Sequence, residues 1–127
     1  MKIFYKSEIS SAHRIKNHIG KCRNLHGHNY IIEVEIESDN LDENGFIIDF
    51  SKIKEIIHQL DHKVILQKDD PLVEKLYDQS IFIMDEPPSC ENIAKLIAHV
   101  ISKELKNYKR IKVRVRESRR SYSEFTL

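Results

Sequence analysis

The sequence is poor in cysteine, in net charge and in long apolar runs, and each shortage excludes a class of protein. Two cysteines among 127 residues are too few for a disulfide framework, which favours a reduced, intracellular protein. A formal net charge of +1 gives no field that would favour nucleic acid or a membrane surface as a partner. No stretch approaches the roughly 20 apolar residues of a membrane span, and the N-terminal MKIFYKSEIS lacks the apolar core of a secretory signal. We therefore expect a cytoplasmic protein.

What is present is the composition of a globular domain. Apolar residues make up 40% of the chain and charged residues 32%, a balance typical of folded rather than disordered proteins. A chain of 127 residues is long enough to bury a core without disulfides. No internal repeat, low-complexity tract or linker interrupts it. We expect one domain over residues 1–127.

Alternating apolar and charged residues predict four strands. In residues 28–38, HNYIIEVEIES, the apolar side chains fall on one face and the glutamates on the other. Residues 1–10, 110–118 and 122–127 show the same type of pattern. The short apolar run GFIIDF (45–50) is a further candidate for a strand or for a lead-in to a helix.

Two longer segments have helical spacing, namely 51–60 with Ser51 as the expected N-cap and 89–105 with Ser89. Between them the pattern is weaker, with a short helix expected from Asp70 and a short strand at SIFIM. The main elements follow in the order strand, strand, helix, helix, strand, strand. This order predicts an α+β fold in which a four-stranded antiparallel sheet carries two main helices on one face.

The stretch CRNLHGHNY combines a cysteine with two histidines. If His26 and His28 enter a strand, they point to the same side of the sheet, which allows both imidazoles to share one zinc ion. A hairpin would bring His13 alongside them, and three histidines with an open fourth position describe a catalytic zinc site. Two alternatives remain at this point. The pair alone is often found without metal, and Cys22 as a fourth ligand would make a closed structural site.

Three other positions carry chemistry. Asp61 precedes His62, and an aspartate can orient such a ring and raise its pKa for acid/base work, although a bare Asp-His pair is usually a solvated surface feature. Glu117 lies among arginines, either as a rim salt bridge or as a partner for a ring edge with two parallel N–H donors. Cys90 begins the second helix, where the dipole can lower its pKa, but apolar packing is its expected role.

Six short motifs occur in one order: SAHR, CRNLHGH, IIDF, LDHKVI, PPSCENIA and VRES. Together they resemble the 6-pyruvoyltetrahydropterin synthase / 6-carboxytetrahydropterin synthase family, including its QueD branch, over nearly the whole chain. The resemblance implies a tunnelling fold (T-fold), a four-stranded antiparallel sheet backed by two helices. It also implies trimers paired into homohexamers, with active sites between subunits. Residues 63–87 depart from the family pattern and are longer than in compact members.

The resemblance also implies roles for individual residues. Cys22 matches the catalytic cysteine and stays outside the metal shell. Asp61 and His62 match the acid/base pair, with His62 acting across a subunit interface. Glu117 matches the carboxylate that anchors the pterin ring. The zinc ligands are matched by three histidines: His13, His26 and His28. Two further residues match positions near the pterin pocket: Ser89 and Glu91.

The activity implied by the resemblance starts from 7,8-dihydroneopterin triphosphate, with zinc as a Lewis acid and the Cys22 thiolate as a base. The three residues between Cys22 and His26 favour the 6-carboxytetrahydropterin synthase branch, which releases acetaldehyde and triphosphate and serves 7-deazaguanine (queuosine) biosynthesis. The alternatives are a 6-pyruvoyltetrahydropterin synthase, which eliminates triphosphate without cleaving the side chain, and a non-catalytic zinc-stabilised module. Lys21, Arg23 and Arg14 flank the site and are candidates for contact with the triphosphate.

Overall fold

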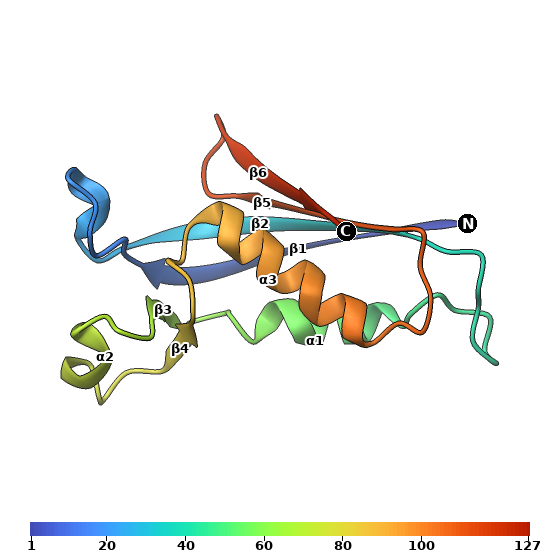
Figure 1. Cartoon of the computed structure of the whole chain (residues 1–127), viewed down its shortest axis with the longest axis horizontal. Helices are drawn as coiled ribbons and strands as arrows, with labels where there is room; N and C mark the ends of the chain where they lie inside the picture. The colour runs from blue at the N-terminus through green and yellow to red at the C-terminus, as the bar shows by residue number, and fades with distance from the viewer.

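The computed structural model describes all 127 residues, and these form an α+β fold around one six-stranded sheet (Figure 1). The strands are β1 (Lys2–His13), β2 (His26–Glu37), β3 (Val64–Gln67), β4 (Ile81–Met84), β5 (Arg110–Arg116) and β6 (Tyr122–Thr126). The helices are α1 (Phe50–His58), α2 (Leu72–Lys75), α3 (Cys90–Lys103) and a 3₁₀ turn, η1 (Lys21–Arg23). No helix combines the length and the apolar character that crossing a bilayer requires.

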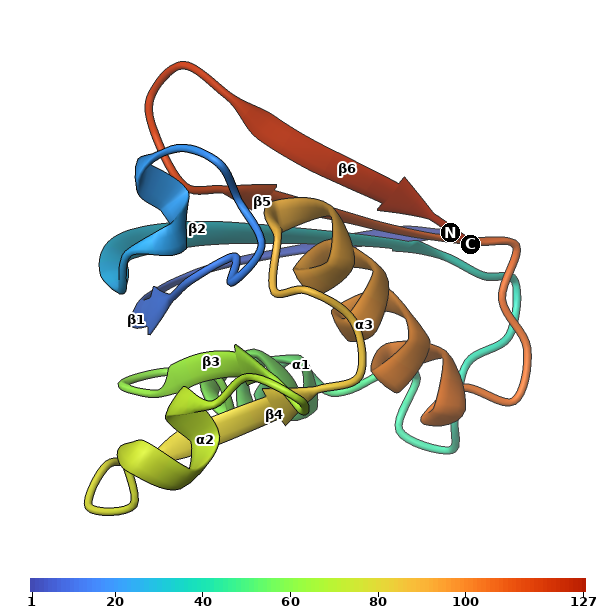
Figure 2. The same cartoon turned by 60° about the vertical axis from the view of Figure 1, so that its left-hand side comes forward.

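The predicted fold class is confirmed, whereas the predicted strand count is wrong. Strands β1, β2, β5 and β6 form the expected antiparallel sheet, and α1 and α3 lie on one side of it (Figures 1 and 2). The sheet has six strands, not four, because β3 and β4 add a parallel pair next to the end of β1, in the order β4-β3-β1-β2-β5-β6. Strand β4 is the short strand predicted at SIFIM, whereas β3, only four residues long, shows no clear alternation in the sequence.

The core lies between the inner face of the sheet and the two main helices. Alternate residues of β2 and β5 point inward, as predicted, and are at most 1% exposed, and the apolar stripe of α3 covers them. Burying one such aliphatic side chain contributes roughly 1.5–3 kcal/mol. The opposite, outer face is charged: Glu35 lies 3.3 Å from the Arg110 guanidinium and 3.5 Å from the Lys112 ammonium. At one end of the inner face, beyond the apolar residues, lies the histidine-bearing segment of β1 and β2.

Two helix starts show how the caps position these elements. Ser89 is the N-cap of α3, as predicted, and its hydroxyl accepts from the Asn92 N–H at 3.3 Å. The predicted Ser51 cap of α1 is wrong, because the Asp49 carboxylate accepts from the Ser51 N–H at 2.8 Å and takes that role. With Asp49 as the cap, residues 45–50 lead into the helix instead of forming a strand.

A buried ion pair fastens the segment 63–87 to the end of β1. Asp70 is 3% exposed, and its carboxylate accepts hydrogen bonds from the Arg14 guanidinium, with Nε at 2.7 Å. The same carboxylate accepts from the Leu72 N–H at 2.9 Å and so caps α2. The hydrogen bonds from Arg14 lower the pKa of Asp70 below its ordinary value. Because Arg14 is held in this way, it is not free for the triphosphate contact considered above.

We predict that Asp70→Ala destabilises the fold by about 3 kcal/mol, since it leaves the Arg14 guanidinium without its buried partner. Asp69→Ala is the matched control, because its ion pair with Lys16 at 2.6 Å is at the exposed surface and its loss should change the unfolding free energy little. Urea unfolding at neutral pH measures both. Equal effects of the two substitutions would contradict the structural role of Asp70.

The contribution of the Arg14–Asp70 ion pair to the stability of the fold depends on pH. Because the folded-state pKa of Asp70 is lowered, the stabilisation is present above the unfolded value of about 4 and is lost as the pH falls through the folded value. The stability difference between the wild type and Asp70→Ala should therefore shrink in acid.

Candidate functional site

The hairpin of β1 and β2 brings three histidines together on the inner face of the sheet. In its register, His13 lies opposite His26 and Ser11 lies opposite His28, so the predicted hairpin is confirmed. The ring of His13 lies 4.6 Å from that of His26 and 5.2 Å from that of His28, centroid to centroid. One ring nitrogen of each histidine lies within 4.8 Å of the others, close enough for all three to hold one metal ion.

The hydrogen bonds of these rings fit a metal centre. A carbonyl oxygen only accepts, so Nδ1 of His13 donates to the Pro88 carbonyl at 2.7 Å and Nδ1 of His26 donates to the Asn24 carbonyl at 2.7 Å. The other nitrogen of His13, Nε2, is buried and has no hydrogen-bond partner. Burial also lowers the pKa of His13, which favours the neutral imidazole that metals bind. Backbone acceptors on Nδ1 with a free Nε2 are the arrangement that orients histidine ligands.

Cys22 lies outside the histidine cluster. It is half-buried in the turn η1, and its carbonyl accepts from the Ile15 N–H at 2.9 Å, which ties the turn to the strand end. It does not belong to the group of mutually close metal-binding atoms, so the geometry favours an open site of three histidines over the closed four-ligand alternative.

A cavity of about 500 Å³ adjoins the cluster and joins residues from four parts of the chain. Figures 1 and 2 show that η1, the turn between β5 and β6 and the start of α3 lie at the same end of the sheet. His18 is exposed, accepts from the Gly20 N–H at 2.8 Å and also borders this cavity. Six residues singled out from the sequence line it together: His13, Cys22, Ser89, Cys90, Glu91 and Glu117.

Glu117 does not form the rim salt bridge that its arginine neighbours suggested. Its Oε2 lies 3.2 Å from the Cys90 Sγ and 3.7 Å from Nε2 of His28, whereas Arg114 pairs with Glu124 at 2.8 Å. The carboxylate therefore turns inward, towards the histidines and the cavity.

Cys90 has more than the packing role expected for it. It is 8% exposed, and burial, followed by the Glu117 carboxylate, raises the pKa of its thiol, opposite to the lowering expected at a helix start. The protonated thiol donates to Glu117. No local pattern revealed this contact, because the two residues are 27 positions apart and meet only when α3 packs on β5.

Tyr30 is a second residue that the functional reasoning missed. It is 1% exposed, and its ring lies 5.7 Å from that of His13 and 5.4 Å from that of His28. Its hydroxyl has no hydrogen-bond partner, and burial raises its pKa. The available signal was its position two residues after His28, on the same face of the strand.

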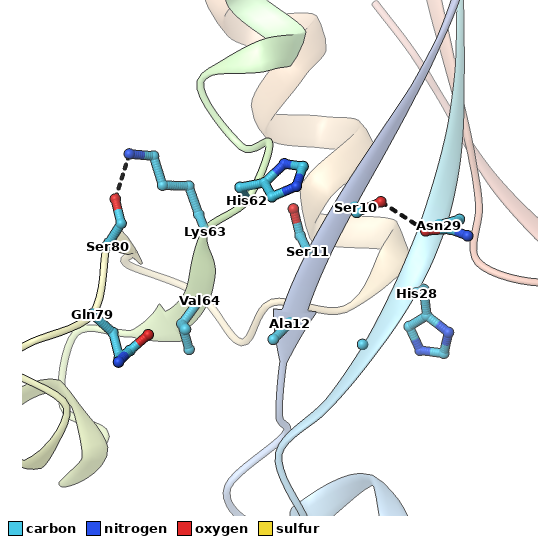
Figure 3. Close-up of a pocket in the computed structure, with 11 residues that line it drawn as sticks. Ser10, Ser11, Ala12, His28, Asn29, His62, Lys63, Val64, Gln79 and Ser80 are labelled. Carbon is cyan, nitrogen blue, oxygen red and sulfur yellow. Dashed lines mark hydrogen bonds between the residues drawn. The ribbon is translucent and has the colours of Figure 1, made fainter.

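The Asp61–His62 pair lies elsewhere. The Asp61 carboxylate accepts from the Ser10 N–H at 2.9 Å, and its other oxygen lies 3.0 Å from Nδ1 of His62, which fits the predicted orienting role. His62 has a positive φ of 56° and an exposed side chain, and it lines a separate cavity of about 480 Å³ with Lys63 and Ser80 (Figure 3). The two cavities share no lining residue, so the structure brings Cys22 and Glu117 together but leaves His62 apart.

Comparison with known sequences identifies the family. A family model described as 6-pyruvoyl tetrahydropterin synthase matches residues 2–127. This chain belongs to that family. A relative from Pyrococcus abyssi, provisionally named a 6-carboxy-5,6,7,8-tetrahydropterin synthase, is 37% identical over 143 aligned positions that cover 99% of this chain and 90% of the relative. The 6-carboxy-5,6,7,8-tetrahydropterin synthase of Rickettsia felis is 36% identical over 103 positions, covering 74% of this chain and 75% of the relative.

Solved structures confirm the T-fold of this pterin synthase family member. The 6-pyruvoyltetrahydropterin synthase of Plasmodium vivax superposes with a TM-score of 0.71 at 22% identity, over 100% of this chain and 97% of that one. A protein of Wolinella succinogenes superposes with a TM-score of 0.74 at 18% identity, over 98% and 97% of the two chains. At such identities the likeness concerns the fold alone.

We predict that His13→Ala abolishes stoichiometric zinc binding. The loss of affinity should exceed the roughly 10- to 100-fold that removing a ligand's hydrogen-bond partner costs, because a ligand itself is removed. His99→Ala serves as the control, since that ring is exposed on α3 and bonds to the Lys95 carbonyl. Metal analysis after dialysis and titration against a chelator provide the measurement. Zinc binding by His13→Ala at the wild-type level would rule out this centre.

Proposed function

We propose that this chain is a zinc-dependent 6-carboxy-5,6,7,8-tetrahydropterin synthase, a lyase acting as one domain over residues 1–127. It would convert 7,8-dihydroneopterin triphosphate to 6-carboxytetrahydropterin, acetaldehyde and triphosphate in 7-deazaguanine (queuosine-type) biosynthesis. The observation that carries the proposal is the open cluster of three histidines beside a cavity shared by Cys22 and Glu117. The names of the Pyrococcus abyssi and Rickettsia felis relatives support the choice of branch.

The metal would be held by His13, His26 and His28, whose free nitrogens converge. A zinc ion bound there supplies a Lewis acid for oxygens of the substrate side chain. The role of the chain itself is to hold the rings of His13 and His26 by backbone carbonyls and to keep the fourth side of the site open to the cavity.

Cys22 is assigned the role of base that removes a proton from a side-chain carbon of the substrate. It lines the same cavity as His13, and its two chain neighbours, Lys21 and Arg23, form no ion pair in the structure. Unpaired cations next to Cys22 attract the triphosphate of the substrate. Lys21 and Arg23 therefore remain candidates for the triphosphate contact, whereas Arg14 does not.

Glu117 is assigned the role of pterin anchor. A carboxylate at the edge of the cavity can accept two parallel N–H bonds, and the 2-amino and N3 edge of a pterin offers this pair. Ser89 and Glu91 line the same cavity at the start of α3 and are assigned to the surroundings of the ring. A volume of about 500 Å³ lies in the range of small-molecule sites.

His62 is proposed to act on the substrate bound by a neighbouring copy of the chain. Strand β6 is an edge strand of the sheet. On the side away from β2, β1 pairs with β3 only at Ala12 and His13, so most of this hydrogen-bonding edge of β1 has no strand partner. Unpaired strand edges favour pairing with another chain. The alternating strand directions put the start of β6 and the end of β1 at the same end of the sheet.

If β6 of one copy pairs antiparallel with β1 of the next, the Cys22 cavity of the first lies beside His62 of the second. Ser121, Tyr122 and Ser123 at the start of β6 line that cavity, and the His62 N–H binds the Ser10 carbonyl at 2.7 Å where the free part of β1 ends. Head-to-tail repetition of this pairing forms a ring where the rotation between copies closes, and such a ring of three copies is the trimer that we propose to pair into a homohexamer. In this arrangement Cys22 and His62 at one reaction site come from two copies, so they lie in separate cavities within each chain.

We predict that the zinc-loaded protein releases acetaldehyde together with triphosphate from 7,8-dihydroneopterin triphosphate. Cys22→Ala should keep its zinc and its assembly state while turnover collapses, because the base is lost but no ligand is. Acetaldehyde detection, metal analysis and size-exclusion chromatography are the measurements.

Two outcomes would contradict this proposal in different ways. Triphosphate release without acetaldehyde would indicate a 6-pyruvoyltetrahydropterin synthase. Loss of stoichiometric zinc in Cys22→Ala would favour a non-catalytic zinc-stabilised module with a fourth ligand.

We further predict complementation between two inactive variants. Cys22→Ala and His62→Ala should each lose most turnover, and co-assembly of the two should restore part of it, because one interface then combines an intact Cys22 with an intact His62. The control is a chain carrying both substitutions, co-assembled with either single variant, which should restore nothing. Absence of complementation in verified mixed assemblies would place His62 and Cys22 in the same copy or outside the reaction.

A further inference from the structure

Glu117 occupies a position between a thiol and a metal site. It directly follows β5, and its Oε2 lies 3.7 Å from Nε2 of His28, one of the three histidines of the cluster. The sole hydrogen bond from the protein to this carboxylate comes from Cys90, whose Sγ lies 3.2 Å from the same oxygen. No arginine or lysine forms an ion pair with it.

This position creates a conflict between two uses of the carboxylate. Glutamate oxygens are good zinc ligands, and a fourth protein ligand would convert an open site of three histidines into a closed one. A glutamate bound to the metal would also be lost as an acceptor for the N–H groups of a bound ring. Glu117 is close enough to His28 for this collapse, so the fold must hold the carboxylate back.

Cys90 is well placed for that purpose. It is the first residue of α3, 8% exposed and part of the buried core, with the Ser89 cap directly before it. An ionised carboxylate is only an acceptor, so the contact requires a protonated thiol as the donor. A thiol fixed at a buried helix start holds Oε2 through one lone pair, which leaves Oε1 without a protein partner and a second lone pair on Oε2 for a further N–H donor.

We propose that Cys90 is a positioning residue that holds Glu117 away from the metal position and presents its free oxygen to the ligand. The part of this inference that concerns the pterin rests on the function proposed above, whereas the part that concerns the metal rests on the histidine cluster alone. Cys90 acts through Glu117 and has no role in bond making.

The test compares Cys90→Ala, which removes the donor, with Cys90→Ser, which keeps one. In Cys90→Ala the carboxylate is released, so zinc should bind more tightly and the KM for the pterin substrate should rise, each by about tenfold, the scale of one hydrogen bond to a charged group. Cys90→Ser should stay near the wild type in both. Chelator competition on the zinc-stripped and reloaded protein gives the metal affinity without any use of activity.

A double-mutant cycle with Glu117→Gln makes the assignment specific. In the Glu117→Gln background, Cys90→Ala should no longer change zinc affinity, because the group that it releases is a far weaker ligand. A purely packing role of Cys90 instead predicts unchanged or weaker zinc binding in Cys90→Ala and no dependence on residue 117. That result, or unchanged zinc affinity and KM in Cys90→Ala, would overturn the inference.

The experiment also separates this inference from the proposed function. If the wild type shows no pterin turnover but the zinc affinities follow the predicted pattern, the positioning role stands and the pterin synthase assignment fails. If the wild type turns over the pterin but Cys90→Ala binds zinc and substrate like the wild type, the function stands and the positioning role fails.

Discussion

The register of the β1–β2 hairpin is the constraint on which the site depends. His13 opposite His26 places both rings, and that of His28, on the inner face of the sheet. Because side chains alternate between faces, a slip of one residue would turn His13 to the outer face and expose the apolar residues of the strand. The apolar rows of β1 and β2 oppose such a slip, so the hydrophobic core, which reaches the histidine rings through Tyr30, stabilises the metal-binding geometry. The core and the histidine cluster lie next to each other along the inner face of the sheet.

A second consequence of this register is that polar groups lie where a core would otherwise continue. The buried end of the inner face holds the unpartnered nitrogen of His13, the unpartnered hydroxyl of Tyr30 and the inward-turned carboxylate of Glu117. Unpaired polar groups are costly in a low-dielectric interior, so such a cluster is retained in folded proteins when a ligand completes it. The start of α3 supplies the groups that organise it, through the Pro88 carbonyl and the Cys90 thiol. Packing of α3 on the sheet therefore adjusts the site as well as closing the core.

The segment 63–87 explains why one chain holds only half of the proposed machinery around each cavity. It folds as β3, α2 and β4 beside the end of β1, where Asp70 pairs with Arg14. This segment pairs with the last residues of β1, and His62 just before it is held by the Ser10 carbonyl. In the assembly proposed above, the cavity of His62 and the cavity of Cys22 would face different neighbouring copies of the chain.

The sequence by itself determined the elements whose cause is local. Alternation of apolar and polar residues predicted the long antiparallel strands, and helical spacing predicted α1 and α3. The two-residue spacing of His26 and His28 put both side chains on one face of the strand. Neighbouring residues decide all of these features. Only the tertiary structure decided the parallel pairing of β3 and β4, the contact of Cys90 with Glu117 and the distance of His62 from the Cys22 cavity. These features join residues that are not neighbours in the sequence, such as Cys90 and Glu117, which are 27 positions apart, and they depend on how finished elements pack. No local pattern contains that information, because packing is set by the shapes of whole faces rather than by the order of neighbouring residues.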